Sequence, residues 1–171
     1  ALRGQEPVVV LKGPERFLQR LAIQTMESVL LQLHGPDGVA IERHRGEHVE
    51  LADVLDALRT PSLLASHTLV IIDGADRLIK EDEDAEDPVT PRGKKARTPR
   101  QVLEDSLAAP FSNATLILQA DEWHPSRIDR AITKLGGALV DCKPPSEKDM
   151  PHWIDRLAKD RERQIDADAK N

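Results

Sequence analysis

Residues 7–20 read PVVVLKGPERFLQR, and this stretch decides the fold class. The run Pro7–Lys12 is short and mostly apolar, which is typical of a central strand of a parallel sheet that is buried on both faces. Gly13 and Pro14 end the run, and apolar residues then recur at helical spacing as far as Leu33. The stretch therefore predicts a strand, a tight turn and an amphipathic helix, the repeating unit of an α/β fold.

The same alternation continues through the rest of the chain. Four more β-branched runs predict strands at 39–43, which is polar enough for an edge strand, and at 67–73, 114–119 and 138–142. Helical periodicity predicts helices at 15–33, 49–58, 99–109 (capped by Thr98), 126–135 (capped by Ser126) and from about 146–149 onward. The prediction is an α/β fold: a doubly wound, five-stranded parallel sheet with helices on both faces, in the three-layer arrangement of P-loop proteins.

The composition indicates a soluble protein with little affinity of its own for nucleic acid. The 171 residues include 24 basic and 30 acidic side chains, and the net charge of −6 gives no positive field to attract a phosphate backbone. Two Phe, two Trp and no Tyr cannot provide base-stacking platforms. The sequence shows no leader, and no run approaches the ~18 apolar residues of a membrane span. We expect a cytoplasmic protein without a membrane partner.

The turn after the first predicted strand looks like a degenerate phosphate-binding loop. The P-loop pattern is G-x-x-x-x-G-K-[ST], and Gly13 supplies only its first glycine. Leu18 replaces the second glycine, Gln19 replaces the lysine that reaches the phosphates, and Arg20 replaces the hydroxyl that binds magnesium. Because all three functional parts are missing, we expect no bound cofactor here.

Asp73, at the end of the predicted strand 67–73, is a second remnant of nucleotide chemistry. An acid at this point supports magnesium in many NTPases, but Gly74 stands where a catalytic Glu often follows. We expect the Asp73 carboxylate to cap the next helix instead. The pattern favours a nucleotide-binding skeleton without its chemistry, and an active P-loop-type nucleotide switch or ATPase remains the alternative.

A phosphorelay receiver domain is a second alternative, because it also alternates five strands with helices. Asp73 would be its phosphoacceptor, and Lys143 would match the receiver lysine. However, that chemistry needs an acidic pair after the first strand to hold magnesium. This chain has Lys12 and Gly13 there, and a cation in that place repels the metal.

No cluster of residues predicts a metal site or a catalytic centre. His44 and His48 are four residues apart, but Gly46 interrupts them at a strand-to-helix turn, and the other histidines are scattered. Cys142 lies in an apolar strand, which favours a buried, inert thiol. We therefore expect no metal and no catalytic residue.

The segment from Pro61 to Ser66 carries the remaining candidate site. It reads PSLLAS, which we expect to form a short turn of helix at the carboxyl edge of the sheet. Leu63 and Leu64 are consecutive and cannot both face a core from one helical turn, so at least one should face outward. An exposed apolar tip usually marks a binding partner, and ordinary packing under the sheet is the alternative.

Two changes of composition divide the chain. We expect an α/β domain at 1–145, interrupted at 81–98 by an acidic and then basic stretch that suits a solvated, mobile loop. Residues 146–171 should form a helix and the beginning of a following helical domain. The sequence ends as another helix begins, which suggests a piece of a longer protein.

Several of these segments together resemble one protein family. They are PVVVLKGPERFL at 7–18, LRTPSLLAS at 58–66 with its strand to Asp73, ATLILQAD at 114–121 and CKPPSEKDMPHWI at 142–154. In their order and spacing they resemble the N-terminal domain of the delta subunits of bacterial DNA polymerase III, which open the sliding clamp within the clamp loader. The resemblance covers nearly the whole chain outside the insertion.

The resemblance implies an AAA+ type fold without ATPase motifs, in a non-catalytic accessory subunit of a DNA-directed DNA polymerase (a nucleotidyltransferase). It implies that Leu63 and Leu64, flanked by Pro61 and Ser62, form a wedge that enters an apolar pocket of the ring-shaped sliding clamp. Leu64 departs from the family, in which an aromatic is common at this position. The other clamp-loader subunits would bind mostly through domains absent from this chain, and primed DNA would be contacted only by the assembled complex.

Overall fold

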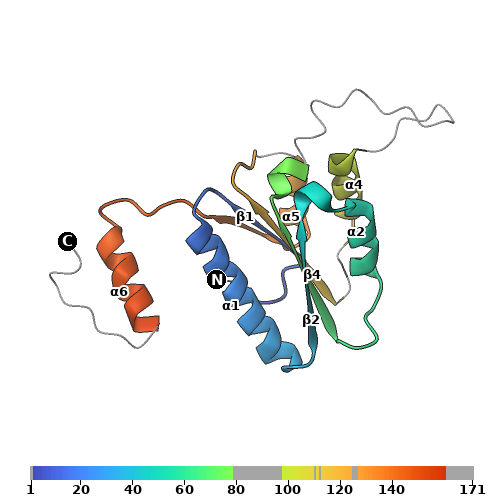
Figure 1. Ribbon diagram of the computed structural model, residues 1–171, viewed down its shortest axis with the longest axis horizontal. Helices are drawn as coiled ribbons and strands as arrows, with labels where there is room; N and C mark the ends of the chain where they lie inside the picture. Colours follow the sequence, from blue (N-terminus) through green and yellow to red (C-terminus); the bar gives the residue numbers. More distant parts are fainter. Residues whose placement is uncertain (1, 79–97, 110, 112, 125–126, 161–171) are drawn as a thin grey trace.

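The computed structural model describes residues 2–78, 98–109, 111, 113–124 and 127–160 (Figure 1). The expected insertion at 81–98, apart from Thr98, lies outside the described residues, as do Ser126 and residues 161–171. In chain order the elements are β1 (Val8–Lys12), α1 (Arg16–His34), β2 (Val39–Arg45), the short 3₁₀ helix η1 (Gly46–His48), α2 (Leu51–Arg59), β3 (His67–Asp73), α4 (Pro99–Ser106), β4 (Ala114–Ala120), α5 (Arg127–Lys134), β5 (Ala138–Asp141) and α6 (Met150–Asp160).

The five strands form one parallel sheet in the order β2-β3-β4-β1-β5. This confirms the doubly wound α/β prediction, and β2 lies at an edge as its polar sequence predicts. The stretch 7–12 predicted a central strand, and β1 is one, because it pairs with β4 on one side and β5 on the other. Its residues Val8, Val9 and Val10 are fully buried. The register pairs Lys12 with Ala120 and Asp73 with Gln119, so the carboxyl ends of β1, β3 and β4 are level at one edge of the sheet.

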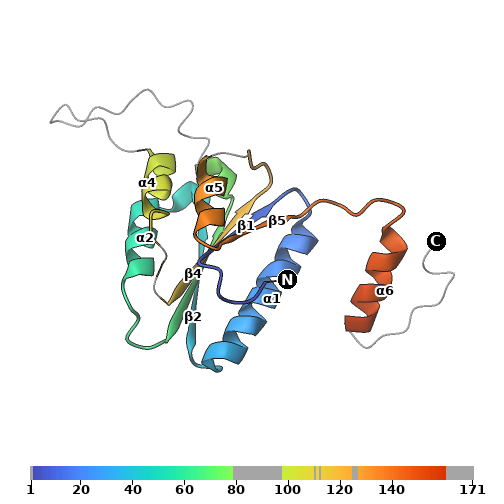
Figure 2. The ribbon, with the colours of Figure 1, turned by 180° about the vertical axis from the view of Figure 1, so that it is seen from behind.

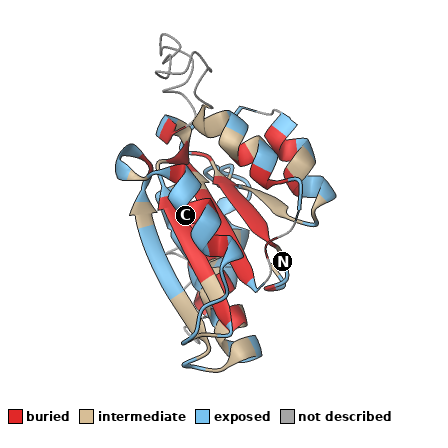
Figure 3. Ribbon diagram, turned by 90° about the vertical axis from the view of Figure 1, so that its right-hand side faces the viewer, coloured by how far each residue is buried: buried red, intermediate tan, exposed pale blue. Residues whose placement is uncertain are grey.

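Helices cover both faces of the sheet (Figures 1 and 2). The alternation of side chains along β1 divides the core: Val8 and Val10 pack with α2, α4 and α5, whereas Val9 and Leu11 pack with α1. Burial is therefore concentrated on the central strands (Figure 3). The result is the expected three-layer arrangement.

Local signals fix where several helices begin and end. Thr98 caps α4 in a capping box with Gln101, and Pro99 occupies the first turn, as the sequence predicts. Glu15 caps α1 through its side chain, and Gly35 ends α1 with a positive φ of 85°. These caps set the two ends of α1 at opposite edges of the sheet.

The last helix stands apart from the sheet. Figures 1 and 2 show α6 beyond α1, joined to β5 by the stretch 142–149. Trp153 of α6 lines an apolar cavity of about 430 Å³ together with Leu18 and Leu21 of α1 and Val140 of β5. The expected boundary between 145 and 146 remains a prediction. Within the described part of the chain, no helix combines the length and the apolar character needed to cross a membrane.

Candidate functional site

The connection between α2 and β3, residues 60–66, exposes two large apolar side chains, and we call it the tip. Leu63 is 101% exposed and Leu64 is 94% exposed, whereas Leu58, at the end of α2, is 1% exposed. The expectation that at least one of the two leucines faces outward is therefore confirmed, and both do. Neither contributes to the core, so packing under the sheet does not explain them.

The tip is a bend, and the predicted turn of helix is wrong. Ser62 Oγ accepts hydrogen bonds from the backbone N–H groups of Leu64 and Ala65, both at 3.2 Å. A serine hydroxyl that binds nearby backbone groups in this way competes with helical hydrogen bonding. Pro61 also disfavours a helical conformation at Thr60, whose ψ is 118°. Both residues therefore favour an open bend that carries Leu63 and Leu64 outward.

The predicted position of the tip is also wrong. A helix that returns to a parallel sheet delivers the chain to the amino end of the next strand, and His67, directly after the tip, is the first residue of β3. His67 N–H donates to the carbonyl of Gly38, which lies just before β2, at 3.0 Å. The tip thus lies at the amino edge of the sheet, whereas the β1–α1 turn lies at the carboxyl edge.

At the carboxyl edge, the backbone after β1 makes hydrogen bonds within the protein. Gly13 N–H donates to Ala120 O, and Glu15 N–H donates to Cys142 O, both at 3.0 Å. Gly13 has a φ of 123°, and a Cβ there would overlap the Cys142 carbonyl, so only glycine fits between these strands. The Glu15 carboxylate accepts from Phe17 N–H at 3.3 Å. A negative side chain therefore stands at the helix N-terminus, where a P-loop protein binds phosphate.

Gln19, in the position of the P-loop lysine, is fully buried and fully engaged. Its Nε2 donates to Gly13 O at 2.7 Å and to Ala120 O at 3.3 Å, and its Oε1 accepts from Gln119 Nε2 at 3.1 Å. The amide links the first turn of α1 to the ends of β1 and β4. In place of the positively charged lysine that binds phosphate in a P-loop, Gln19 therefore supplies a neutral amide that joins α1, β1 and β4.

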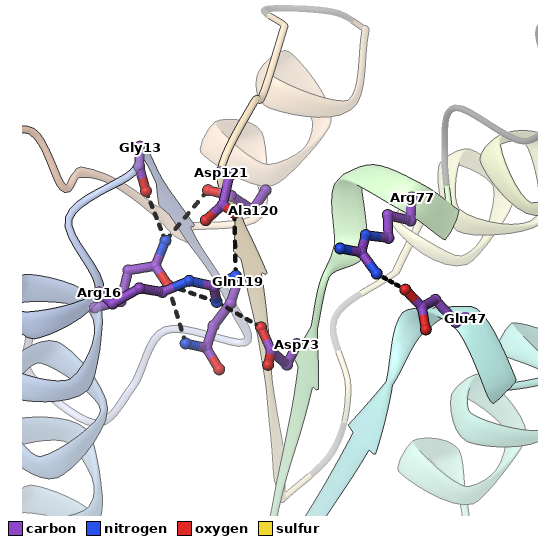
Figure 4. A network of polar contacts seen from close by, with 9 residues as sticks. Gly13, Arg16, Glu47, Asp73, Arg77, Gln119, Ala120 and Asp121 are labelled. Carbon is purple, nitrogen blue, oxygen red and sulfur yellow. Dashed lines mark hydrogen bonds and ion pairs between the residues drawn. The ribbon is translucent and has the colours of Figure 1, made fainter.

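Arg16 bridges the ends of β3 and β4 (Figure 4). Its guanidinium donates to Asp73 at 2.7 Å and to Asp121 at 3.1 Å. The hydrogen bond that Arg16 donates to Asp73 raises the pKa of Arg16 above its ordinary value, against the opposing effect of burial. The Asp73 carboxylate pairs with Arg16, and its expected capping of the next helix stays a prediction. No local sequence pattern pointed to Arg16, because its two partners are 57 and 105 residues away in the chain.

The remaining residues of the degenerate loop point in different directions. Leu18 packs in the α1 core and lines the apolar cavity beside β5, whereas Arg20 is exposed and lines a polar cavity with Arg43 and Asp73. Gly13, Leu18, Gln19 and Arg20 therefore do not converge on one ligand.

The other candidates for chemistry are structural. Cys142 is buried, and burial raises the pKa of its thiol, as the sequence predicts for an inert cysteine. Among the described residues, no three His, Cys, Asp or Glu side chains are grouped so that they could hold a metal ion.

The strand order rejects the receiver alternative. A receiver domain places β1 between β2 and β3, in the order 2-1-3-4-5. Here β1 lies between β4 and β5, and β4 separates it from β3. Asp73 and the first-strand loop are therefore not on neighbouring strands, as a phosphoacceptor and its metal site would require.

Two solved structures are similar to this fold. The DNA clamp loader delta protein of Bacillus subtilis superimposes with a TM-score of 0.63 over 96% of this chain, at 18% sequence identity. This chain has the fold of a clamp loader delta protein. A chain of the HORMA:CdnC:Trip13 complex of Escherichia coli matches with a TM-score of 0.53 over 98% of this chain, at 11% identity. No family model matches the sequence, and comparison with curated proteins gives no match.

The match with the delta protein confirms the resemblance inferred from the sequence at the level of fold. The chain spans about half the length of these two structures, 46% of the delta protein and 58% of the Escherichia coli chain. Two features bear on function: the exposed leucines of the tip, and the carboxyl edge of the sheet, where the groups of the degenerate phosphate loop are hydrogen-bonded within the protein.

Proposed function

We propose that this chain is the clamp-binding part of a delta-type subunit of a bacterial DNA polymerase III clamp loader. Leu63 and Leu64 bind an apolar pocket of the ring-shaped sliding clamp, and Pro61 and Ser62 shape the tip that presents them. The observation that carries this proposal is the full exposure of two adjacent leucines. The delta-type fold supports it.

The tip is sufficient to dominate a small interface. Burying a leucine side chain contributes about 1.5–3 kcal/mol, so Leu63 and Leu64 together contribute about 3–6 kcal/mol. A few such residues usually carry most of the binding energy of an interface. If the tip fits only a distorted clamp, this energy shifts the clamp toward an open ring.

We also propose that the chain does not hydrolyse ATP. The N–H groups of Gly13 and Glu15 are already bonded, the Glu15 carboxylate stands at the helix N-terminus, and Gln19 replaces the lysine. Hydrolysis by other clamp-loader subunits would control when the tip is available. Those subunits would bind through domains outside this chain, primed DNA would be contacted only by the assembled complex, and the role would be cytoplasmic.

A calorimetric titration of this chain with the cognate sliding clamp tests the main proposal. We expect saturable binding by the wild type and a loss of about two to four decades in affinity for the Leu63→Ser/Leu64→Ser variant. Phe17→Ser is the matched control, because Phe17 is an exposed apolar residue (41%) at the opposite edge. Wild-type affinity in the folded double variant would refute the assignment of the tip.

A titration with ATP and magnesium tests the second part. We expect neither binding nor phosphate release, because the groups that would receive the phosphates are bonded within the protein. Stoichiometric ATP binding would support the alternative of an active nucleotide switch or ATPase.

A further inference from the structure

Two histidines stack directly behind the tip, at the amino edge of the sheet. His34 ends α1 and His67 begins β3, and their ring centroids are 4.7 Å apart with an interplanar angle of 23°. His67 is buried, whereas His34 is partly exposed. The tip is directly connected to this pair, because its last residue, Ser66, immediately precedes His67 in the chain.

Each ring contacts a hydroxyl group that also lies within hydrogen-bonding distance of a backbone carbonyl. Ser66 Oγ donates to Gly38 O at 3.1 Å and lies 3.4 Å from His34 Nδ1. Thr115 Oγ1 donates to Glu6 O at 3.1 Å and lies 3.1 Å from His67 Nε2.

With the single proton of each hydroxyl directed at the backbone carbonyl, the histidine nitrogens are the donors in these contacts. This arrangement requires the Nδ1–H tautomer of His34 and the Nε2–H tautomer of His67. Two relays of the same kind run side by side, each from imidazole N–H to hydroxyl to backbone carbonyl. One of them passes through the hydroxyl of Ser66, in the tip, and ends on Gly38 O.

We propose that Ser66 and His34 are positioning residues that fix the direction in which the tip presents Leu63 and Leu64. This inference rests on the proposed clamp-binding function of the tip. The hydroxyl of Ser66 connects the tip to two other elements: to the end of α1 through His34, and to the start of β2 through Gly38.

The other end of the tip is fixed in a similar way. Thr60 donates from its N–H to Ala57 O at 3.1 Å and from its hydroxyl to Asp56 O at 3.0 Å, both on α2. With Ser62 holding the bend between them, the tip is anchored at both ends and braced in the middle. A loop that is already ordered loses little conformational entropy when it binds. The anchors therefore raise the affinity of the tip for its partner although they do not contact the partner.

Imidazole nitrogen NMR on the free chain tests the anchor without any clamp. Spectra recorded at about pH 8, where histidine side chains are ordinarily neutral, report which ring nitrogen carries the proton. We expect Nδ1–H for His34 in the wild type and loss of this preference in Ser66→Ala, with Ser66→Thr restoring it. An Nε2–H tautomer for His34 in the wild type would overturn the proposal.

Clamp affinity then tests whether the anchor matters for binding. One such hydrogen bond contributes about 0.5–1.5 kcal/mol, so Ser66→Ala and His34→Ala should each weaken binding roughly two- to twelvefold, while Ser66→Thr retains affinity. Thr25→Ala is the matched control, because its exposed hydroxyl also donates to a backbone carbonyl but lies in the middle of α1. Wild-type affinity in both alanine variants would overturn the positioning role.

The two hypotheses fail differently. If the tip does not bind the clamp, replacement of Leu63 and Leu64 has no effect on affinity, whereas the tautomer of His34 still responds to Ser66→Ala. If only the positioning role is wrong, the leucine variant loses binding and the Ser66 variants do not.

Discussion

Replacement of Gln19 by leucine should destabilise the protein although no charge is removed. The two side chains are similar in size, but leucine cannot donate to Gly13 O, for which Gln19 Nε2 is the hydrogen-bond donor in the described part of the chain. Ala120 O keeps its bond from Gly13 N–H, so one buried carbonyl is left without a partner. Such a group costs about 1–3 kcal/mol.

Thermal unfolding measures this cost. For a chain of 171 residues, 1 kcal/mol corresponds to about 2–4 °C, so Gln19→Leu should lower the Tm by about 2–12 °C. Gln24→Leu is the matched control, since it makes the same change on the exposed face of α1 and should alter the unfolding free energy by less than about 0.5 kcal/mol. If both variants melt at the wild-type temperature, the buried amide does not hold the β1–α1 turn in place.

Two further outcomes follow from burial. Leu58→Ala should cost about 2–5 kcal/mol in chemical denaturation, whereas Leu63→Ser/Leu64→Ser should change stability by less than about 1 kcal/mol; equal losses would mean that the leucines of the tip belong to the core. Burial, with a smaller effect of the neighbouring His34, lowers the pKa of His67 to about 4. Because the unfolded chain then binds more protons, the unfolding free energy should fall as the pH drops from about 6.5 toward about 4, and His67→Asn should flatten this dependence; an unchanged pH profile in that variant would contradict the assignment.

The sequence by itself determined the elements and their class. Hydrophobic periodicity is a local property, and a short β-branched run such as 8–12, bounded by Gly13 and Pro14, is typical of a buried strand. The missing parts of the phosphate loop, at Leu18, Gln19 and Arg20, could be identified by spacing alone. The same is true of the Thr98 cap, which depends on residues three positions apart. The outward position of a leucine at the tip followed from the geometry of consecutive residues.

Only the tertiary structure decided how distant residues meet. Arg16 joins Asp73 and Asp121 because β3 and β4 end at the same edge, and no local pattern encodes which strands are neighbours. The path of the chain through the sheet likewise decides at which edge the tip lies. It also decides that Ser66 of the tip contacts His34 at the end of α1. Sequence periodicity fixes which face of an element is buried, whereas strand order and register fix which side chains from different elements come within hydrogen-bonding distance.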